Sequence, residues 1–268
     1  MIETYRSMVH PWECDTVDHF TTAFYFAAFG SANWHLLQRL GLDSAAIAAL
    51  EPTACRTRFM RELRAGDTYH IVSGVLDTAP ARLGHQLFNS ETAELCATHA
   101  QDFAGDIGRL EPIDWPDERP MDEIDFACLT VWSPTAANIV HARDLDHSGR
   151  LSLSALIHWG SDANVQFQNR IGMTSSYMRE NLIGFATMAY HIGIDRLPRA
   201  PGAVIRIESA LAHLGRTSLS IAHRVVDGQT GAPIATMAQF GVHFDRKARR
   251  PAEIPDRIRT AAQELAPQ

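Results

Sequence analysis

An internal repeat constrains the fold of this chain more than any other feature of its sequence. When the 268 residues are moved by 131 positions against themselves, six residues are identical over the thirty positions from Asp15 to Ser44, where composition alone predicts about two. Further along, "ATHAQ" (97–101) matches "ATMAQ" (235–239) at an offset of 138. The common order of these matches indicates a duplication, and the change of offset predicts a longer hairpin in the second copy.

Each copy has the same predicted order of elements. A short strand (5–12 and 136–142) is followed by a turn that contains Asp and then by a long helix, at about 20–40 and 151–171. The first helix is rich in Ala, Phe and Leu on most sides, which is typical of a helix surrounded by protein. Several strand-like segments follow each helix, and the turn "DGQTGAP" (227–233) is typical of a hairpin.

Four segments follow from this order. They are a first unit at 1–110, a linker at 111–134 rich in Pro and acidic residues, a second unit at 135–250, and a polar tail at 251–268 with a helical pattern. The predicted fold class is therefore α+β, with two tandem units that each combine one long helix with antiparallel strands.

Composition and charge exclude several classes of protein. The chain is 46% hydrophobic and 21% charged, as in globular proteins. Its net charge of −7 and the lack of a long basic stretch argue against nucleic acid as a partner. No apolar run is long enough to cross a bilayer, and no signal peptide is recognisable, so a cytoplasmic location is expected. The four cysteines form no Cys-x-x-Cys pair and are expected to be reduced thiols.

The segment "DLDHSGRLSLSA", from Asp144 to Ala155, resembles the start of a calcium loop. A calcium-binding EF-hand needs a bidentate Glu at the twelfth position, where this chain has Ala155, and it needs helices on both sides. His141 and His147, together with Asp144 and Asp146, are an alternative metal site, but their spacing is loose and the first copy lacks most of them. No metal and no cofactor are therefore predicted.

One strand, a buried helix and then antiparallel strands, twice over, resembles the hotdog fold, in which a curved antiparallel sheet wraps a long central helix. Thioesterases of the 4-hydroxybenzoyl-CoA type have a motif close to D-x-x-G-H-x-N-x-x-x-Y at the turn into that helix. The first copy reads "DTVDHFTTAFY", in which Asp15, His19 and Tyr25 match. The second copy reads "DHSGRLSLSAL", in which Asp146 and Gly149 match. The chain thus resembles a double-hotdog thioesterase, with two fused copies in place of the usual dimer.

This resemblance implies hydrolysis of an acyl-CoA or acyl-carrier-protein thioester. The turn aspartates are expected to act as base or nucleophile, and His19 to orient the carboxylate. The amide seven residues after each Asp, Thr22 or Leu153, is expected to bind the oxyanion at the helix N-terminus. Tyr25 and Gly149 are expected to contribute to substrate binding. Structural roles stay open, because the aspartates could only cap a helix or shape a turn, and His19 could only hold the turn.

The departures from the motif favour Asp15 as the working site. Asp15 keeps the His and Tyr of the motif, whereas Asp146 has Arg150 and Leu156 in their places. Arg150 is expected to pair with Asp146, which would make that carboxylate a poorer base and nucleophile. Asp18 stands where the motif has Gly, and if the position needs a positive φ, Asp tolerates it better than most residues do.

Two arginines are candidates for binding CoA phosphates. "CRTRFMRELR" places Arg56 and Arg58 on one face of a strand. Solvated surface charge is the alternative for them and for the basic stretch "DRKARR" (245–250). A non-catalytic acyl-CoA-binding protein and a hotdog enoyl-CoA hydratase or dehydratase remain the alternatives to a thioesterase. The acyl group, and whether the fused pair forms a homo-oligomer, stay open.

Overall fold

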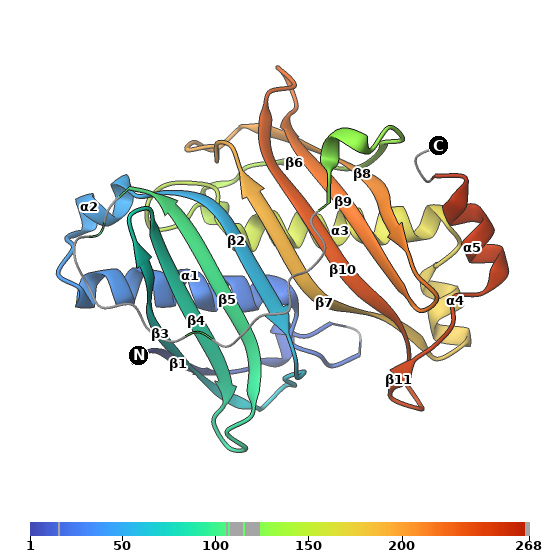
Figure 1. Ribbon diagram of the computed structural model, residues 1–268, viewed down its shortest axis with the longest axis horizontal. Coiled ribbons are helices and arrows are strands. Elements are labelled where there is room, and N and C mark those ends of the chain that lie inside the picture. The colour runs from blue at the N-terminus through green and yellow to red at the C-terminus, as the bar shows by residue number, and fades with distance from the viewer. Residues whose placement is uncertain (16, 106, 108–114, 116–123, 266–268) are drawn as a thin grey trace. The chain divides into compact units, whose positions relative to one another are not determined.

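The computed structural model describes residues 1–15, 17–105, 107, 115 and 124–265 (Figure 1). The chain forms two compact units. Unit 1 consists of Met1–Glu118, Val140–His158 and Gly193–Gly202, and unit 2 of Arg119–Ile139, Trp159–Ile192 and Ala203–Gln268. Unit 1 therefore includes the Asp turn of the second repeat. Half of the predicted linker, 111–134, lies outside the described residues, which include 115 and 124–134.

Unit 1 contains a five-stranded antiparallel sheet in the order β1-β3-β4-β5-β2. The strands are β1 (Ile2–Met8), β2 (Glu51–Phe59), β3 (Thr68–Thr78), β4 (Ala81–Asn89) and β5 (Leu95–Ala104). The helical segments are η1 (Pro11–Glu13), α1 (Thr22–Arg39), α2 (Ser44–Ala49), η3 (Ala142–Asp144) and the first residues of α3 (Leu153–Arg170).

Unit 2 contains a sheet in the order β7-β10-β9-β8-β6, with a short β11 paired to β10. The strands are β6 (Ser133–Ile139), β7 (Ile183–Ile194), β8 (Val204–Leu214), β9 (Ser218–Asp227), β10 (Pro233–Asp245) and β11 (Arg250–Pro251). The helices are η2 (Phe126–Cys128), α4 (Ser175–Glu180) and α5 (Asp256–Gln263), besides most of α3. The tail helix α5 is more than a polar appendage, because Ile258 and Ala262 are buried in one core cluster with Phe167 and Leu219.

The two repeats agree element by element. The long helices begin at Thr22 and Leu153, and the short helices that follow begin at Ser44 and Ser175, in each case 131 residues apart. The equivalent strands β3 and β8 begin at Thr68 and Val204, 136 residues apart. The offset therefore changes mainly before β8. The prediction that a longer hairpin accounts for the added length of the second repeat is therefore wrong for most of the added residues, which precede β8.

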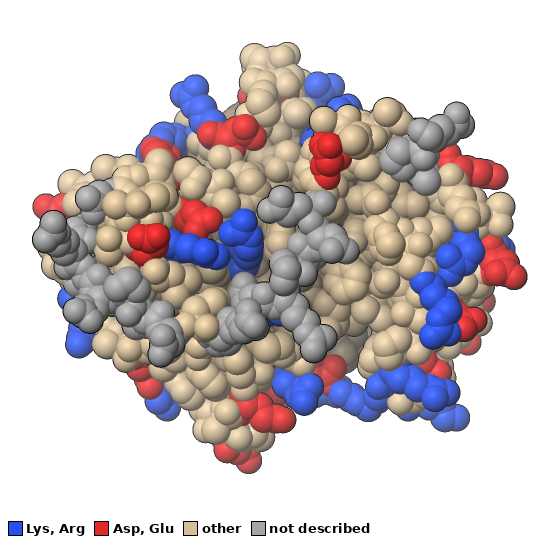
Figure 2. Space-filling model, viewed as in Figure 1, with Lys and Arg blue, Asp and Glu red and all other residues tan. Residues whose placement is uncertain are grey.

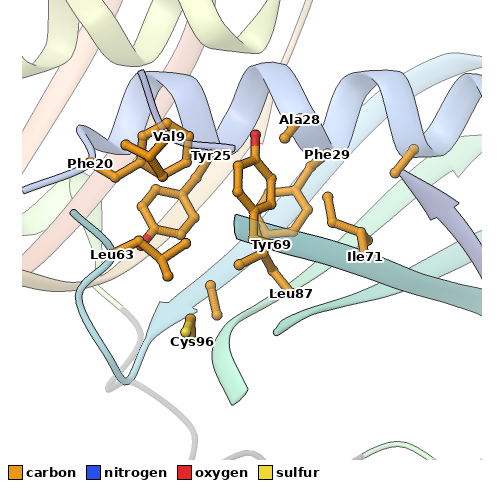
Figure 3. Packing of buried hydrophobic residues seen from close by; sticks show 12 residues of the cluster. Val9, Phe20, Tyr25, Ala28, Phe29, Leu63, Tyr69, Ile71, Leu87 and Cys96 are labelled. Atoms are coloured by element: carbon orange, nitrogen blue, oxygen red, sulfur yellow. The ribbon is translucent and has the colours of Figure 1, made fainter. Parts of the chain in front are cut away.

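The long helix α1 packs on the sheet of unit 1 through one of its faces. Tyr25, Ala28 and Phe29 share a core cluster with Ile71 of β3 and Leu87 of β4 (Figure 3). Full burial of a large apolar side chain contributes about 1.5–3 kcal/mol to stability. Several such contacts fix α1 firmly, and they determine where the residues on its remaining faces point.

Surface charges on the face drawn in Figure 2 are mixed in sign, with Lys and Arg interspersed among Asp and Glu. The charged side chains include exposed ion pairs, such as that of Arg6 with Glu3. Among the helices that the structure describes, none combines the length and the apolar character of a membrane-spanning segment.

Candidate active site

The two Asp turns have the same local structure. The backbone N–H of Asp15 donates to the His19 carbonyl at 2.9 Å, and that of Asp146 donates to the Arg150 carbonyl at 2.7 Å. Asp15 Oδ1 accepts from the His19 N–H at 3.0 Å. Asp146 Oδ1 accepts from the Arg150 N–H at 3.1 Å. In both turns Oδ1 holds the loop, and within the described residues Oδ2 has no hydrogen bond.

The fourth position of each turn has a left-handed backbone. Asp18 has φ 65° and Gly149 has φ 72°. This backbone conformation explains why one repeat has Asp where the other has Gly. Glycine adopts the left-handed region freely, and aspartate adopts it more readily than most residues do. The departure of Asp18 from the motif leaves the turn intact.

The predicted oxyanion donors stand at the starts of the two long helices. Thr22 is the first residue of α1 and Leu153 the first residue of α3. Neither backbone N–H has an acceptor within the described part of the chain. At the start of α3 the Ser152 hydroxyl caps the helix by accepting from the Ala155 N–H at 3.1 Å, and it does not accept from the Leu153 N–H. Both amides thus point outward at the positive end of a helix dipole.

The surroundings of Asp15 are exposed and charged. His19 Nε2 lies 3.4 Å from Glu62 Oε2 and 3.3 Å from Arg64 Nη2. Arg64 also pairs with Glu62 at 2.8 Å. The His19 ring is therefore engaged by this ion pair, and the contact of His19 with Asp15 comes from its backbone.

Tyr25 lies in the core of unit 1. Its side chain is 3% exposed, and its ring packs against Phe20 with a centroid distance of 4.6 Å (Figure 3). The ring of Phe59 lies on it edge-on at 5.2 Å. Burial raises the pKa of the Tyr25 hydroxyl, which bonds to the backbone of Leu63. The predicted role of Tyr25 in substrate binding stays a prediction, and its position is that of a packing residue.

A pocket of about 380 Å³ lies beside Asp146. Its wall contains α1, the segment from α2 to β2, β5, and the turn that leads into α3, all of which belong to unit 1. The larger apolar residues of the lining are Phe26, Trp34, Leu37, Ile47, Leu50, Phe103, Leu145, Leu151, Leu153 and Leu197. Asp146 and Ser154 also line the pocket. One concave site therefore combines a carboxylate, a helix N-terminus and apolar walls.

The guanidinium of Arg150 does not pair with the Asp146 carboxylate. It is buried, with Nε 3.0 Å from Glu51 Oε2, and its Nη2 donates to the Ala48 carbonyl. Only the backbone N–H of Arg150 contacts the Asp146 side chain. The expectation that an ion pair with Arg150 makes the Asp146 carboxylate a poorer base and nucleophile is therefore wrong, because the Arg150 guanidinium pairs with Glu51 instead.

A family model described as the thioesterase-like superfamily matches residues 9–118 and 140–262. The chain belongs to this superfamily. The match covers both repeats, and it confirms the resemblance to thioesterases and the expected enzyme class, a thioester hydrolase. No curated protein matches the sequence.

Solved structures similar to this thioesterase-like chain share its fold at low identity. The 12:0-ACP thioesterase from Umbellularia californica has a TM-score of 0.63 and 8% identity, over 89% of this chain and 93% of that one. An acyl-ACP thioesterase from Bacteroides thetaiotaomicron has a TM-score of 0.64 and 9% identity, over 88% of this chain and 96% of that one. These likenesses support a hotdog-type fold across both repeats.

The arginines predicted to bind phosphate are not among the residues that line the pocket. Arg56 Nη1 is 3.6 Å from Asp102 Oδ2, and Arg58 is half-buried on the same strand. The arginines that do line the pocket of this thioesterase-like chain are Arg143, which is exposed, and Arg150. The proposal of a CoA phosphate site at Arg56 and Arg58 stays untested.

The sequence interpretation missed three buried polar residues of the pocket. Asn33, His99 and Gln101 all line it. The repeat contained a signal, because Asn33 and Gln101 recur at the matching positions of the second copy. His99 stands in "ATHAQ", where the second copy has Met237. A polar residue in only one copy of a buried strand distinguishes the two repeats.

The alternative metal site receives no support from the described residues, in which no group of three or more His, Cys, Asp or Glu side chains is placed to hold a metal ion. Asp144 instead accepts from the His141 N–H at 2.7 Å and holds the short helix η3. The cysteines are free thiols.

Proposed function

We propose that this thioesterase-like chain hydrolyses an acyl thioester of coenzyme A or of an acyl carrier protein in the pocket beside Asp146. The observation that supports this most strongly is the presence of Asp146 and the Leu153 amide in one pocket with apolar walls. The walls suit an acyl group, and the polar elements suit attack on its thioester. The names of the two similar structures, both ACP thioesterases, support the carrier-protein ester as one of the two candidates.

In the proposed mechanism Asp146 Oδ2 takes a proton from the attacking water or attacks the carbonyl carbon directly. The N–H groups of Ser148 and Arg150 hold Oδ1 at 2.8 and 3.1 Å and orient the carboxylate. The developing oxyanion accepts from the Leu153 N–H, and one such donor is worth about 2.7–4 kcal/mol. When the tetrahedral intermediate collapses, the C–S bond breaks and the thiolate leaves. In the general-base route the thiolate takes up the proton that Asp146 removed from water, and the free acid is formed directly. In the nucleophilic route the thiolate takes up a proton from water, and a second water hydrolyses the acyl–Asp146 anhydride to the free acid and restores the carboxylate.

The Asp15 turn is a second candidate for the same chemistry, with His19 and Thr22 in the corresponding places. The pocket favours Asp146, contrary to the motif, because a carboxylate acts only where an acyl group can bind beside it.

As part of the same proposal, the sheet of each unit curves around its long helix. The repeats then run over 1–110 and 135–250, with the tail at 251–268.

A panel of acyl-CoA and acyl-carrier-protein thioesters of increasing chain length, assayed for free thiol, tests the proposed function. Thiol release well above the uncatalysed rate is expected for at least one of them. Binding without thiol release would favour a non-catalytic acyl-CoA-binding protein. Addition of water to an enoyl-CoA without thiol release would favour a hydratase.

Arg143 provides a test of the carrier. It lines the pocket and its side chain is 83% exposed, so its guanidinium can bind a CoA phosphate that remains in solvent at the mouth of the pocket. Arg143→Ala is expected to raise KM for the CoA ester several-fold more than for a truncated pantetheine ester. Arg56→Ala and Arg58→Ala, compared in the same assay, test the candidates taken from the sequence. Equal effects of Arg143→Ala on both esters would exclude a phosphate contact at this residue.

A further inference from the structure

The buried polar residues of the pocket form a cluster whose hydrogen-bond directions are fixed. Asn33 Nδ2 donates to Gln101 Oε1 at 2.6 Å. His99 Nε2 lies 3.2 Å from the same oxygen. Because a carbonyl oxygen only accepts, His99 must carry its proton on Nε2. Its Nδ1 then accepts from the Thr57 hydroxyl at 2.8 Å.

His85 continues this cluster away from the pocket. Its Nε2 lies 2.7 Å from Asn33 Oδ1, so it donates there, and its Nδ1 accepts from the Ser73 hydroxyl at 2.6 Å. A hydroxyl group can donate or accept, so the contacts at Nδ1 fit a neutral or a charged ring. Burial decides between the two, because it lowers the pKa of His99 to about 4 and that of His85 well below its usual value. Each ring is therefore neutral and accepts at Nδ1.

These bonds leave the amide N–H groups of Gln101 without an acceptor within the described residues, while its Oε1 accepts twice. The Gln101 side chain is only 6% exposed and lines the pocket. A buried donor is normally satisfied by protein, by water or by a ligand. The Gln101 amide is therefore placed to donate to a group inside the pocket.

The second repeat differs at this point. Gln239 is the counterpart of Gln101, and its Nε2 donates to the Thr187 hydroxyl at 2.7 Å. Met237 takes the place of His99. In unit 2 the amide donor is thus used inside the protein, and in unit 1 the corresponding donor faces the pocket.

We infer that Gln101 determines specificity, by donating a hydrogen bond from its amide to an oxygen atom carried on the acyl group of the substrate. The preferred substrates are then hydroxyacyl or oxoacyl thioesters rather than plain alkanoyl ones. The uncharged cluster suits a neutral oxygen, because a carboxylate buried beside two neutral imidazoles would lack a counter-charge. This inference rests on the proposed function, since it names the substrate class of the same pocket.

The test compares kcat/KM for hexanoyl-CoA with that for its 3-hydroxy, 3-oxo, 5-hydroxy and 5-oxo derivatives. The best oxygenated ester is expected to exceed hexanoyl-CoA by about tenfold in wild type, in keeping with one hydrogen bond to a buried donor. Gln101→Leu is expected to bring this ratio within about twofold of unity. Gln239→Leu, the matched change in unit 2, is expected to leave the ratio unchanged.

Gln101→Glu sharpens the test and guards against a folding defect in Gln101→Leu. It keeps an oxygen for Asn33 and His99. Because burial favours the uncharged acid, its second oxygen carries a proton at low pH and can donate to the substrate as the amide does. The variant is therefore expected to keep the preference for oxygenated esters at low pH, and to lose the preference for oxoacyl esters at high pH, where its carboxylate only accepts.

Two outcomes would overturn the inference. One is a wild-type enzyme that prefers hexanoyl-CoA to all four derivatives. The other is a Gln101→Leu variant in which kcat falls equally for every ester, because that result would place the amide on the thioester itself. If no ester is hydrolysed, the proposed function fails, and the same ratio taken from the dissociation constants of the CoA esters tests Gln101 independently.

Discussion

Arg150 Nε lies 3.0 Å from Glu51 Oε2, although 99 residues separate the two in sequence. The pair links the start of β2 to the turn that carries Asp146. Because the backbone N–H of Arg150 also holds Asp146 Oδ1, the position of the guanidinium helps to fix the carboxylate. Glu51 is thus a positioning residue for the proposed site, although it does not line the pocket.

Glu51→Ala is expected to lower the free energy of unfolding by about 1–2 kcal/mol. The buried Arg150 would lose its carboxylate partner and Arg199, at the surface, would lose a second contact, but the Glu51 side chain is 53% exposed, so water can replace part of both contacts. Urea denaturation measures the change. The matched control is Glu3→Ala, which removes a surface ion pair worth about 0–1 kcal/mol. Equal shifts for the two variants would mean that the Arg150 pair contributes no more than a surface pair.

Gly30 tests the pocket directly. It lies on the exposed side of α1 and lines the pocket, and a Cβ added there would meet no atom within 4 Å. Gly30→Ala is expected to stabilise the helix by about 0.5–1 kcal/mol with little effect on turnover. Gly30→Leu is expected to reduce kcat/KM for long acyl esters at least about tenfold more than for acetyl-CoA, because its side chain occupies acyl space. A uniform loss across chain lengths would show that α1 does not border the acyl group.

Much of this architecture was predictable because each repeat is a continuous stretch of sequence with its elements in the same order. The offset of 131 placed both helices and both Asp turns correctly, and the motif explained why Gly149 and Asp18 share a left-handed backbone. The partner of Arg150 was not predictable, since nothing near it in sequence marks Glu51. A motif compares only neighbours along the chain, and so it assigned the guanidinium to the adjacent Asp146.

The pocket itself was also beyond the sequence. Its wall brings together α1 and the turn before α3, which belong to different repeats. In the sequence, Asn33 and Gln101 were visible only as residues that are identical in the two repeats. Their hydrogen bond depends on how α1 packs against β5, which the sequence does not show. For this reason the motif favoured Asp15, while the pocket favours Asp146.

The pH dependence of stability tests the neutral cluster. Unfolded His99 takes up a proton near pH 6.5, whereas burial lowers its folded pKa to about 4. The unfolded state therefore binds more protons between these values, and wild-type stability should fall as the pH drops from 6.5 to 4, by about 3 kcal/mol from His99. His99→Met, which copies the second repeat, should be less stable at pH 7.5 through lost hydrogen bonds but should show a shallower fall. Parallel curves for the two proteins from pH 7.5 to 4 would contradict the assignment of a neutral, buried His99.

The proposed mechanism requires the Asp146 carboxylate to act on the thioester, and kcat for Asp146→Asn and Asp15→Asn on the best wild-type substrate tests this requirement. Asparagine keeps the Oδ1 acceptor that holds each turn and removes the base or nucleophile, so folding should be preserved in both variants. Asp146→Asn is expected to lower kcat by about 100-fold or more, and Asp15→Asn to stay within about threefold of wild type. A fully active Asp146→Asn beside an inactive Asp15→Asn would contradict the account and return the catalytic role to the first turn.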